Sequence, residues 1–221
     1  YSKFNNLTFV LALLFIIMSF LIGERANFIR TIVVIFLYLF FLHETTFRYK
    51  ILSIVLLIIS FVTFLNFNPE YKKRYFNEIG LVFQNGVTKY LEETNYGAHR
   101  NVAKEIFKDN PIFGVGIKNF RVESANPKYD NLDHKQNYLR VSTHPHELYH
   151  ELISETGLFG LLSFLTFIIF SLFLSLKNYL IYKNSFQFSA ILFVFISILP
   201  VLPSGSFLST FSSSIFWINY S

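Results

Sequence analysis

The chain has 221 residues, of which 52% are hydrophobic and 19% aromatic, while charged residues make up 15%. Because a typical soluble domain carries ~25% charged residues, this composition argues against an ordinary soluble protein and favours a membrane protein. Cysteine is absent, which excludes disulfides, thiol chemistry and cysteine-based zinc sites. The formal net charge is +5, yet residues 68–156 hold twelve basic and twelve acidic side chains. The surplus therefore flanks the apolar blocks, as in membrane proteins, and does not form a nucleic-acid-binding patch.

Three apolar blocks open the chain, at residues 7–22, 27–42 and 51–67. Each is slightly shorter than the ~20 residues that cross a typical hydrocarbon core, and flanking polar residues extend the helices. A polar interruption at residues 23–26 joins the first two blocks. Residues 1–67 are therefore predicted to form three transmembrane helices with a short outward-facing hairpin at 23–26.

Residues 68–156 form the one long polar stretch of the chain and are rich in turn-forming residues. Residues 98–108 carry apolar side chains at helical spacing, and Asn110 and Pro111 stop that helix. Residues 126–137 are predicted to be an irregular loop. This part of the chain is thus expected to be one large, partly helical loop that carries the functional motifs.

Further apolar blocks follow at residues 157–176, 186–202 and 207–220, and the first two are separated by a basic link at 177–183. The last block is short and serine-rich, which is typical of a re-entrant piece or of the start of a further span. Residues 157–221 are therefore predicted to form two to three transmembrane or re-entrant helices.

Short-loop charge predicts the orientation of these helices. The links at 43–50 and 177–183 are both net basic and lie on the same side, so we expect them in the cytoplasm. The large loop then faces outward, which in a bacterium is the periplasm. The predicted fold is all-α: a polytopic membrane protein with about five to six transmembrane helices and one large, partly helical periplasmic loop.

Residues 143–160 read T-H-P-H-E-L-Y-H-E-L-I-S-E-T-G-L-F-G and concentrate the reactive side chains. Thr143 is expected to cap a helix, with Pro145 in its first turn. His146 to His150 spell H-E-x-x-H, which on a helix places two imidazoles on one face for zinc, with Glu147 activating a water. One hypothesis is therefore a membrane zinc metalloprotease.

The protease hypothesis needs a third zinc ligand. Glu155 and Asp133 are candidates, but no downstream motif marks either residue. A non-enzymatic transport or scaffold protein is a further alternative. Buried charges in mid-span would favour transport, and the sequence places none there, because Arg30 is close to a span end.

A longer pattern covers the same stretch and resembles the signature of the O-antigen ligase and polymerase superfamily. The matching residues are His144, His146, Glu155, Gly157 and Gly160. Two other segments are similar to family motifs: residues 100–120, an arginine-led helix that ends in a Pro–Gly–x–Gly turn, and residues 23–25, an arginine at the start of a span.

The resemblance covers residues 20–180 and corresponds to the C-terminal portion of proteins about twice as long. Two residues depart from the family pattern. Glu147 stands where the family usually has Asn, Ser or Gln, and His150 stands where the family is usually apolar. Gly157 and Gly160 are expected to let another helix approach closely.

The resemblance implies a glycosyltransferase of the bacterial inner membrane that needs no metal or other cofactor. It would move a glycan from undecaprenyl pyrophosphate to an acceptor hydroxyl, on lipid A–core or another glycan, at the periplasmic face. A polymerase of the same superfamily remains an alternative.

The residue chemistry fits this activity. His146 is the predicted general base, because imidazole titrates near neutral pH. Arg25 and Arg100 are predicted to bind the pyrophosphate, His144 to support as a donor, and Arg30 to be a weaker substrate-binding candidate. The remaining histidines, His43, His99 and His134, are expected to lie on surface loops.

Overall fold

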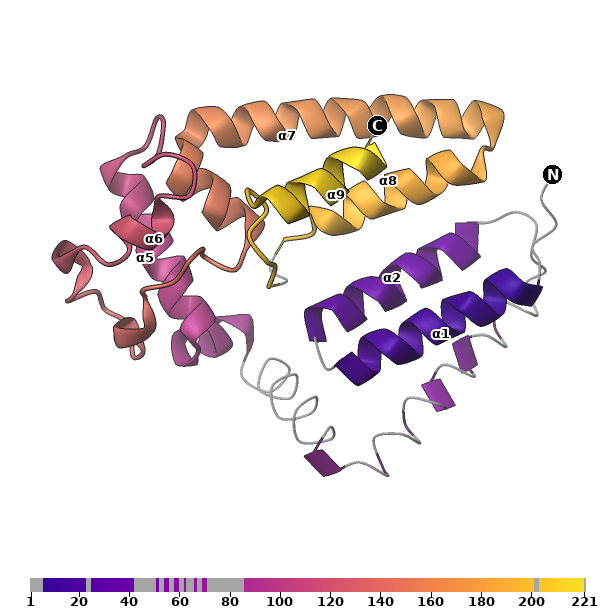
Figure 1. Cartoon of the computed structure of the whole chain (residues 1–221), viewed down its shortest axis with the longest axis horizontal. Coiled ribbons are helices and arrows are strands. Elements are labelled where there is room, and N and C mark those ends of the chain that lie inside the picture. Colours follow the sequence, from indigo (N-terminus) through magenta and orange to yellow (C-terminus); the bar gives the residue numbers. More distant parts are fainter. Residues whose placement is uncertain are drawn as a thin grey trace.

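The computed structural model describes residues 6–22, 25–41, 86–200 and 203–220, together with scattered positions between 51 and 70. Within these residues every regular element is a helix (Figure 1), which agrees with the predicted all-α class. The third apolar block and the link at 43–50 lie largely outside the described residues.

The first two apolar blocks form a pair of helices, α1 (Asn6–Ile22) and α2 (Arg25–Phe41). Their predicted boundaries are correct to within two residues, because the apolar runs end where polar residues begin. Phe20 and Phe28 pack with ring centroids 5.0 Å apart at the closed end of this pair. Tyr38 stacks on Phe188, which ties α2 to the C-terminal helices.

Three helices follow the large loop: α7 (Leu148–Tyr182), α8 (Ser185–Ser197) and α9 (Thr210–Tyr220). In Figure 1 α8 lies between α2 and α7, and it packs against both of them and against α9. The predicted basic link at 177–183 is wrong, because all but its last residue continues α7. The helix ends only at Lys183, whose φ is 51°, and the Asn184 side chain then accepts a hydrogen bond from the Phe186 amide at 2.9 Å.

The packing of these helices is that of a membrane domain. Ile168, Val194 and Phe216 form a buried core between α7, α8 and α9. Phe170 and Phe173 of α7 stay more than 60% exposed. Among the described residues, α7 is the one helix that is both long and apolar enough to cross a bilayer, and apolar segments at Ala26–Tyr38 and Ser185–Ser197 are shorter. The total of five to six spans stays a prediction.

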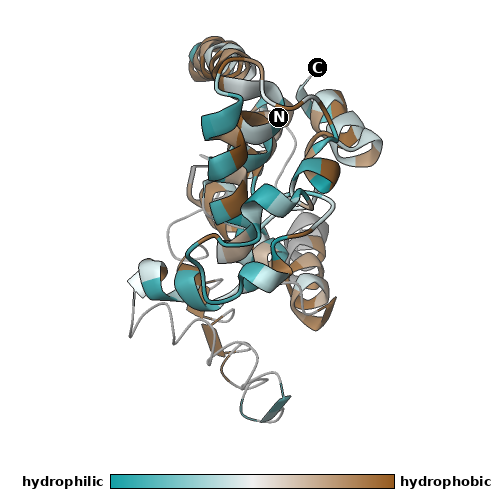
Figure 2. Cartoon of the chain, turned by 90° about the vertical axis from the view of Figure 1, so that its left-hand side faces the viewer, coloured by the Kyte–Doolittle hydropathy of each residue, from teal (hydrophilic) through white to brown (hydrophobic). Residues whose placement is uncertain are grey.

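The large loop folds at one end of the helices, and Figure 2 shows hydrophilic segments gathered there. The helix predicted at 98–108 is confirmed as part of α5, which ends at Asp109 with Asn110 as its C-cap. The predicted irregular loop at 126–137 is largely confirmed, since its regular structure is the short turn η1 and the first residue of η2. The elements of this region are a helical stretch at 86–93, α5 (Asn95–Asp109), α6 (Phe120–Glu123), η1 (Pro127–Tyr129) and η2 (Asn137–Leu139).

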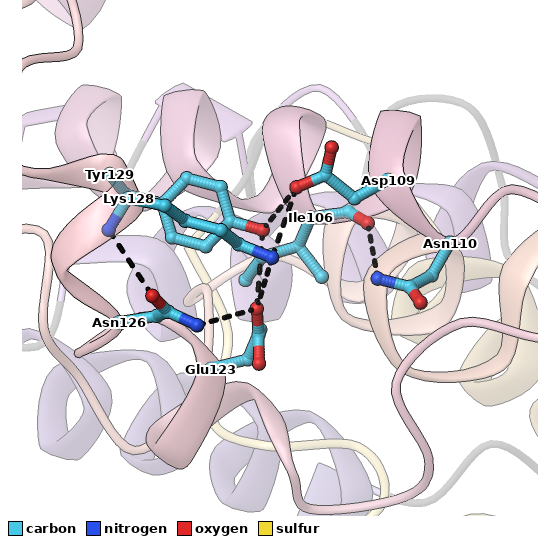
Figure 3. Close-up of polar contacts among 7 residues, drawn as sticks. All are labelled: Ile106, Asp109, Asn110, Glu123, Asn126, Lys128 and Tyr129. Atoms are coloured by element: carbon cyan, nitrogen blue, oxygen red, sulfur yellow. Dashed lines mark hydrogen bonds and ion pairs between the residues drawn. The ribbon is translucent and has the colours of Figure 1, made fainter.

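A polar network fastens the loop to the end of α5 (Figure 3). The Tyr129 hydroxyl donates to the Asp109 carboxylate at 2.8 Å, and the Lys128 ammonium lies 2.7 Å from Glu123 and 3.2 Å from Asp109. Asn126 caps the turn by accepting from the Lys128 amide. The Tyr129 ring also belongs to a buried core with α5 and α6 residues. The loop is therefore a folded unit that can hold functional side chains in place.

Candidate functional site

Gly157 breaks α7 into two helical segments, because its φ of 65° and ψ of −168° are not helical. In an unbroken helix the amides of Leu158 and Phe159 would donate to the carbonyls of Ser154 and Glu155. Here they donate instead to residues of the preceding loop, Leu158 to the Pro111 carbonyl at 2.9 Å and Phe159 to the Ile112 carbonyl at 3.1 Å.

The two carbonyls that the break releases are also satisfied by the same loop. The Val115 amide donates to the Ser154 carbonyl at 3.0 Å, and the Gly116 amide donates to the Glu155 carbonyl at 2.9 Å. Residues 111–116 thus replace two helical hydrogen bonds with four, which pair all four backbone groups that the two lost bonds release. The two family-like motifs, residues 100–120 and 155–160, are therefore halves of one structural unit.

Glycine is required on both sides of this junction. A Cβ at Gly157 would lie 2.4 Å from the Ile112 carbonyl carbon, and a Cβ at Gly114 would lie 2.4 Å from the Glu155 carbonyl carbon. The expectation that Gly157 admits another helix is therefore wrong, and the same expectation for Gly160 stays a prediction. Gly157 admits a turn, and a Cβ at Gly160 would meet the Thr156 side chain of its own helix.

Two buried carboxylates stand one helical turn apart on α7, and each is 1% exposed. Glu155 accepts from the amides of Lys118, at 2.6 Å, and Phe120, at 3.3 Å. Glu151 accepts from the Ser206 hydroxyl and from the Phe207 amide at 2.7 Å. The first part of α7 is thus a platform on which two distant segments dock.

The start of α7 differs from the prediction. Glu147 is the N-cap, and its carboxylate accepts from the His150 amide at 3.0 Å and contacts the His150 ring nitrogen Nδ1. The expected cap at Thr143 and first turn at Pro145 are wrong, because His146 has a left-handed φ of 60° that a helix cannot contain.

This geometry removes the helical premise of the zinc hypothesis. His146 lies outside the helix, so His146 and His150 are not successive positions on one helical face. Glu147 serves as a cap, and Glu155 binds backbone amides of the loop. Nowhere in the described part of the chain do three or more His, Cys, Asp or Glu side chains converge in a group that could hold a metal ion.

Three aromatic rings gather around the imidazole of His146. Its ring lies 4.0 Å from His144 between centroids, stacks on His99 at 5.1 Å with a 27° interplanar angle, and meets the edge of Tyr96 at 5.7 Å. The expectation that His99 is a surface residue is wrong, since it is 4% exposed on α5. Tyr96 and His99 are three residues apart on one helical face, a spacing that could have marked them.

Burial keeps the His146 imidazole neutral. Desolvation, with a smaller contribution from the neighbouring charges of His144 and His99, lowers the pKa of His146 to about 4. Nε2 of His146 lies 3.2 Å from the Ser142 hydroxyl. At neutral pH this side chain is therefore a free base. Its left-handed backbone is a strained conformation of the kind found at functional sites.

Ser204 connects the imidazoles to a large cavity. Its amide donates to the His146 carbonyl at 2.9 Å, and its carbonyl lies 3.3 Å from Nε2 of His144. A carbonyl only accepts, so Nε2 of His144 carries the proton and Nδ1 faces the Thr143 hydroxyl at 2.9 Å. Ser204 also lines a cavity of about 1110 Å³.

The cavity is walled by apolar side chains of the helices, including Phe15 of α1, Val34 of α2, Phe193 of α8 and Phe211 of α9. Among the described residues that line it, Arg30 is the one with a charged side chain. A cationic group on an apolar wall suits a ligand with a long apolar part and an anionic head.

The other predicted residues fall at different places. Arg100 follows His99 on α5, half-buried, and its Nε is buried without a hydrogen-bond partner. Arg25 is the first residue of α2, and its side chain lies outside what the structure describes. The structure thus brings His144 and His146 together and joins them to the cavity of Arg30.

The site combines a folded loop, a membrane helix with a backbone break and a neutral histidine above an apolar cavity. A family model described as O-antigen ligase matches residues 9–165. No curated protein and no solved structure matches the chain. Since the family match covers well over half of the sequence, the chain belongs to the O-antigen ligase family, whose members are integral membrane proteins.

Family membership confirms the resemblance drawn from the sequence, and it implies a glycosyltransferase-like enzyme that acts on lipid-linked glycans in general. The match runs from α1 into α7 and takes in both halves of the Gly157 junction.

Proposed function

We propose that the chain transfers a glycan from undecaprenyl pyrophosphate to an acceptor hydroxyl at the periplasmic membrane face, without a metal. The observation that carries this proposal is the position of Ser204, which contacts both His144 and His146 and also lines the apolar cavity. A reaction between a lipid-borne donor and a soluble or lipid-borne acceptor needs a base at the junction of an apolar and a polar compartment.

The donor would lie with its prenyl chain against the apolar wall of the cavity and its pyrophosphate toward Arg30. Arg25 is the first residue of the same helix. Arg100 directly follows His99 on α5, and its guanidinium Nε has no hydrogen-bond partner. Arginine suits this role because it stays charged and binds phosphate oxygens through two donors. The acceptor hydroxyl can belong to lipid A–core or to another glycan. The proposal therefore covers a polymerase as well as a ligase.

In the proposed step the acceptor oxygen attacks the anomeric carbon as the bond from that carbon to the pyrophosphate oxygen breaks. The hydroxyl proton passes to His146, which is unprotonated at neutral pH because burial lowers its pKa. The pyrophosphate leaves as an anion held by arginine. His144 orients the site through its contact with the Ser204 carbonyl.

The test is His146→Ala in the full-length protein, assayed for glycan transfer in membrane vesicles supplied with lipid-linked donor. Loss of a general base is expected to lower the rate by ~100-fold or more. His150→Leu is the matched control and should keep the rate. Chelators should have no effect, and activity that a chelator removes and zinc restores would overturn the proposal.

Arginine substitutions test the donor site separately. Arg25→Lys, Arg30→Lys and Arg100→Lys keep the charge but lose the paired donors. We expect transfer to fall, with a raised KM for the lipid-linked donor. Normal kinetics in all three variants would remove the pyrophosphate-binding role while leaving the role of His146 intact.

A further inference from the structure

The turn at residues 111–117 exposes an unusual number of apolar side chains for a polar loop. Ile112, Phe113 and Ile117 are 61%, 70% and 61% exposed. None of them joins the buried core of the loop, which uses other residues. We call these three side chains the apolar edge. Exposed apolar groups that cluster in this way mark a contact surface.

The apolar edge is continuous with the outward surface of α7. The Phe113 ring packs against Phe159 with centroids 5.9 Å apart, and the Ile112 carbonyl accepts from the Phe159 amide. Phe159 itself is 65% exposed, as are many side chains further along the same helix. The edge therefore extends the surface that α7 presents to lipid.

The length of α7 fixes the depth of this contact. The apolar part of the helix runs from Leu158 to Leu176, and Lys177 follows. At about 1.5 Å per residue this stretch is roughly 28 Å long, close to the ~30 Å of a hydrocarbon core. Leu158 and Phe159 must then lie at the outer boundary of the hydrocarbon, and Phe113 lies beside them.

Basic side chains flank the apolar edge on its polar side. Lys118 and Arg121 are both exposed, and the Arg121 Nε donates to the Lys118 carbonyl at 3.2 Å, which holds the two residues together. Apolar side chains next to Lys and Arg are the usual composition of segments that lie in a membrane interface. The four backbone bonds to α7 also pair four polar backbone groups of the turn, which lipid would otherwise penalise.

We propose that the apolar edge is inserted in the outer leaflet of the phospholipid bilayer. Ile112, Phe113 and Ile117 contact the boundary between headgroups and acyl chains, and Lys118 and Arg121 bind lipid phosphates. The loop is then anchored to the membrane beside α7, which fixes the height of the imidazoles above the hydrocarbon. This proposal rests on the membrane span of α7 and not on the transferase activity.

The test uses the absence of cysteine in the chain. Phe113→Cys introduces a single site for a nitroxide label in the chain reconstituted in vesicles of phosphatidylethanolamine and phosphatidylglycerol. Collision of the label with oxygen, which concentrates in lipid, is compared with collision with a water-soluble nickel chelate. Tyr138→Cys is the matched control, since Tyr138 is 74% exposed in the same loop and away from α7.

The expected result is an oxygen-dominated signal at position 113 and a nickel-dominated signal at position 138. Ile117→Cys repeats the measurement if the first variant does not fold. Nickel accessibility at 113 and 117 equal to that at 138 would overturn the proposal. A label shielded from both reagents would also overturn it, since another protein segment or a second copy would then cover the edge.

Discussion

Two segments far apart in the sequence dock on the same two turns of α7, and they are held in different ways. Residues 111–120 make four backbone hydrogen bonds across the Gly157 break in addition to the Glu155 contacts. Residues 203–209 are attached through the Glu151 carboxylate and through the contacts of Ser204 with His144 and His146. The first attachment is made largely by backbone groups, whereas the second is made largely by the Glu151 and His144 side chains and has one backbone bond, from the Ser204 amide to the His146 carbonyl.

The difference makes the attachment of residues 111–120 the more rigid of the two and the attachment of residues 203–209, which contacts His146, the more adjustable. The 111–120 side sets the position of α7 relative to the loop. The 203–209 side borders the apolar cavity and makes a single backbone bond to this part of the chain. A segment with fewer backbone bonds can open locally at a lower free-energy cost.

The largest effect is expected from Gly157→Ala, which attacks the backbone attachment. The new Cβ would lie 2.4 Å from the Ile112 carbonyl carbon at a φ of 65°, so the junction cannot close. We expect a loss of at least about 3 kcal/mol in the free energy of unfolding. Thermal unfolding in detergent measures it. Gly205→Ala is the control, because a Cβ there meets nothing within 4 Å. Equal stability of the two variants would contradict the close approach of Gly157 to residues 112–114.

A smaller and local effect is expected from Glu151→Ala. It leaves the Ser206 hydroxyl and the Phe207 amide without their acceptor, a loss of about 2 kcal/mol. Hydrogen exchange should accelerate at Phe207. The matched variant Glu155→Ala should accelerate exchange at Lys118 and Phe120 and cost less overall, since four backbone bonds remain. The comparison is contradicted if Glu155→Ala accelerates exchange at Lys118 and Phe120 more than Glu151→Ala accelerates it at Phe207.

The pH dependence tests the histidine that the second segment contacts. Because the folded pKa of His146 is lowered from 6.5 to about 4, transfer should stay at its plateau at pH 7 and fall only as the pH nears 4. Between pH 6.5 and 4 the unfolded chain binds a proton that the folded chain does not, so this residue makes stability fall as pH falls. His146→Gln should reduce that slope. An acid limb centred above pH 6.5 would contradict the lowered pKa.

The smallest effect is expected from His150→Leu. The variant loses the contact between the ring and Glu147 but keeps the amide that Glu147 caps. We expect a change in unfolding free energy within about 1 kcal/mol. Thermal unfolding checks this value. A collapse of the fold on this substitution would show that the Glu147 cap depends on the ring.

The sequence correctly predicted the features that hydrophobic patterning determines, which are the all-helical class and the helix boundaries. The boundaries of α1, α2 and α5 are close to those predicted, and the pairing of His144 with His146 follows from their spacing. It did not predict how residues 111–116 meet residues 154–159, because a hydrogen-bond exchange between distant backbone segments leaves no periodic trace. The helix start was wrong for a similar reason, since Glu147 was assigned to chemistry and its capping role depends on the conformation of His146.

His99 shows the same limit for the site itself. The sequence predicted pyrophosphate binding for its neighbour Arg100 and a surface loop for His99. The stacking of the His99 ring on His146 depends on the fold. The clue within reach was the spacing of Tyr96 and His99 on one face of α5. The basic stretch at 177–183 was read as a loop from its charge, although lysine is a good helix former and nothing before Lys183 interrupts the helix.

The Gly157 junction also has a consequence for how the protein is made. Synthesis runs from the N-terminus, so residues 111–116 emerge well before residues 154–159. The part of α7 that follows Gly157 can complete its hydrogen bonds only after the loop has folded against it. The folded loop therefore acts as the template that sets where this span begins, and a folding defect in the loop would leave α7 without a defined register in the bilayer.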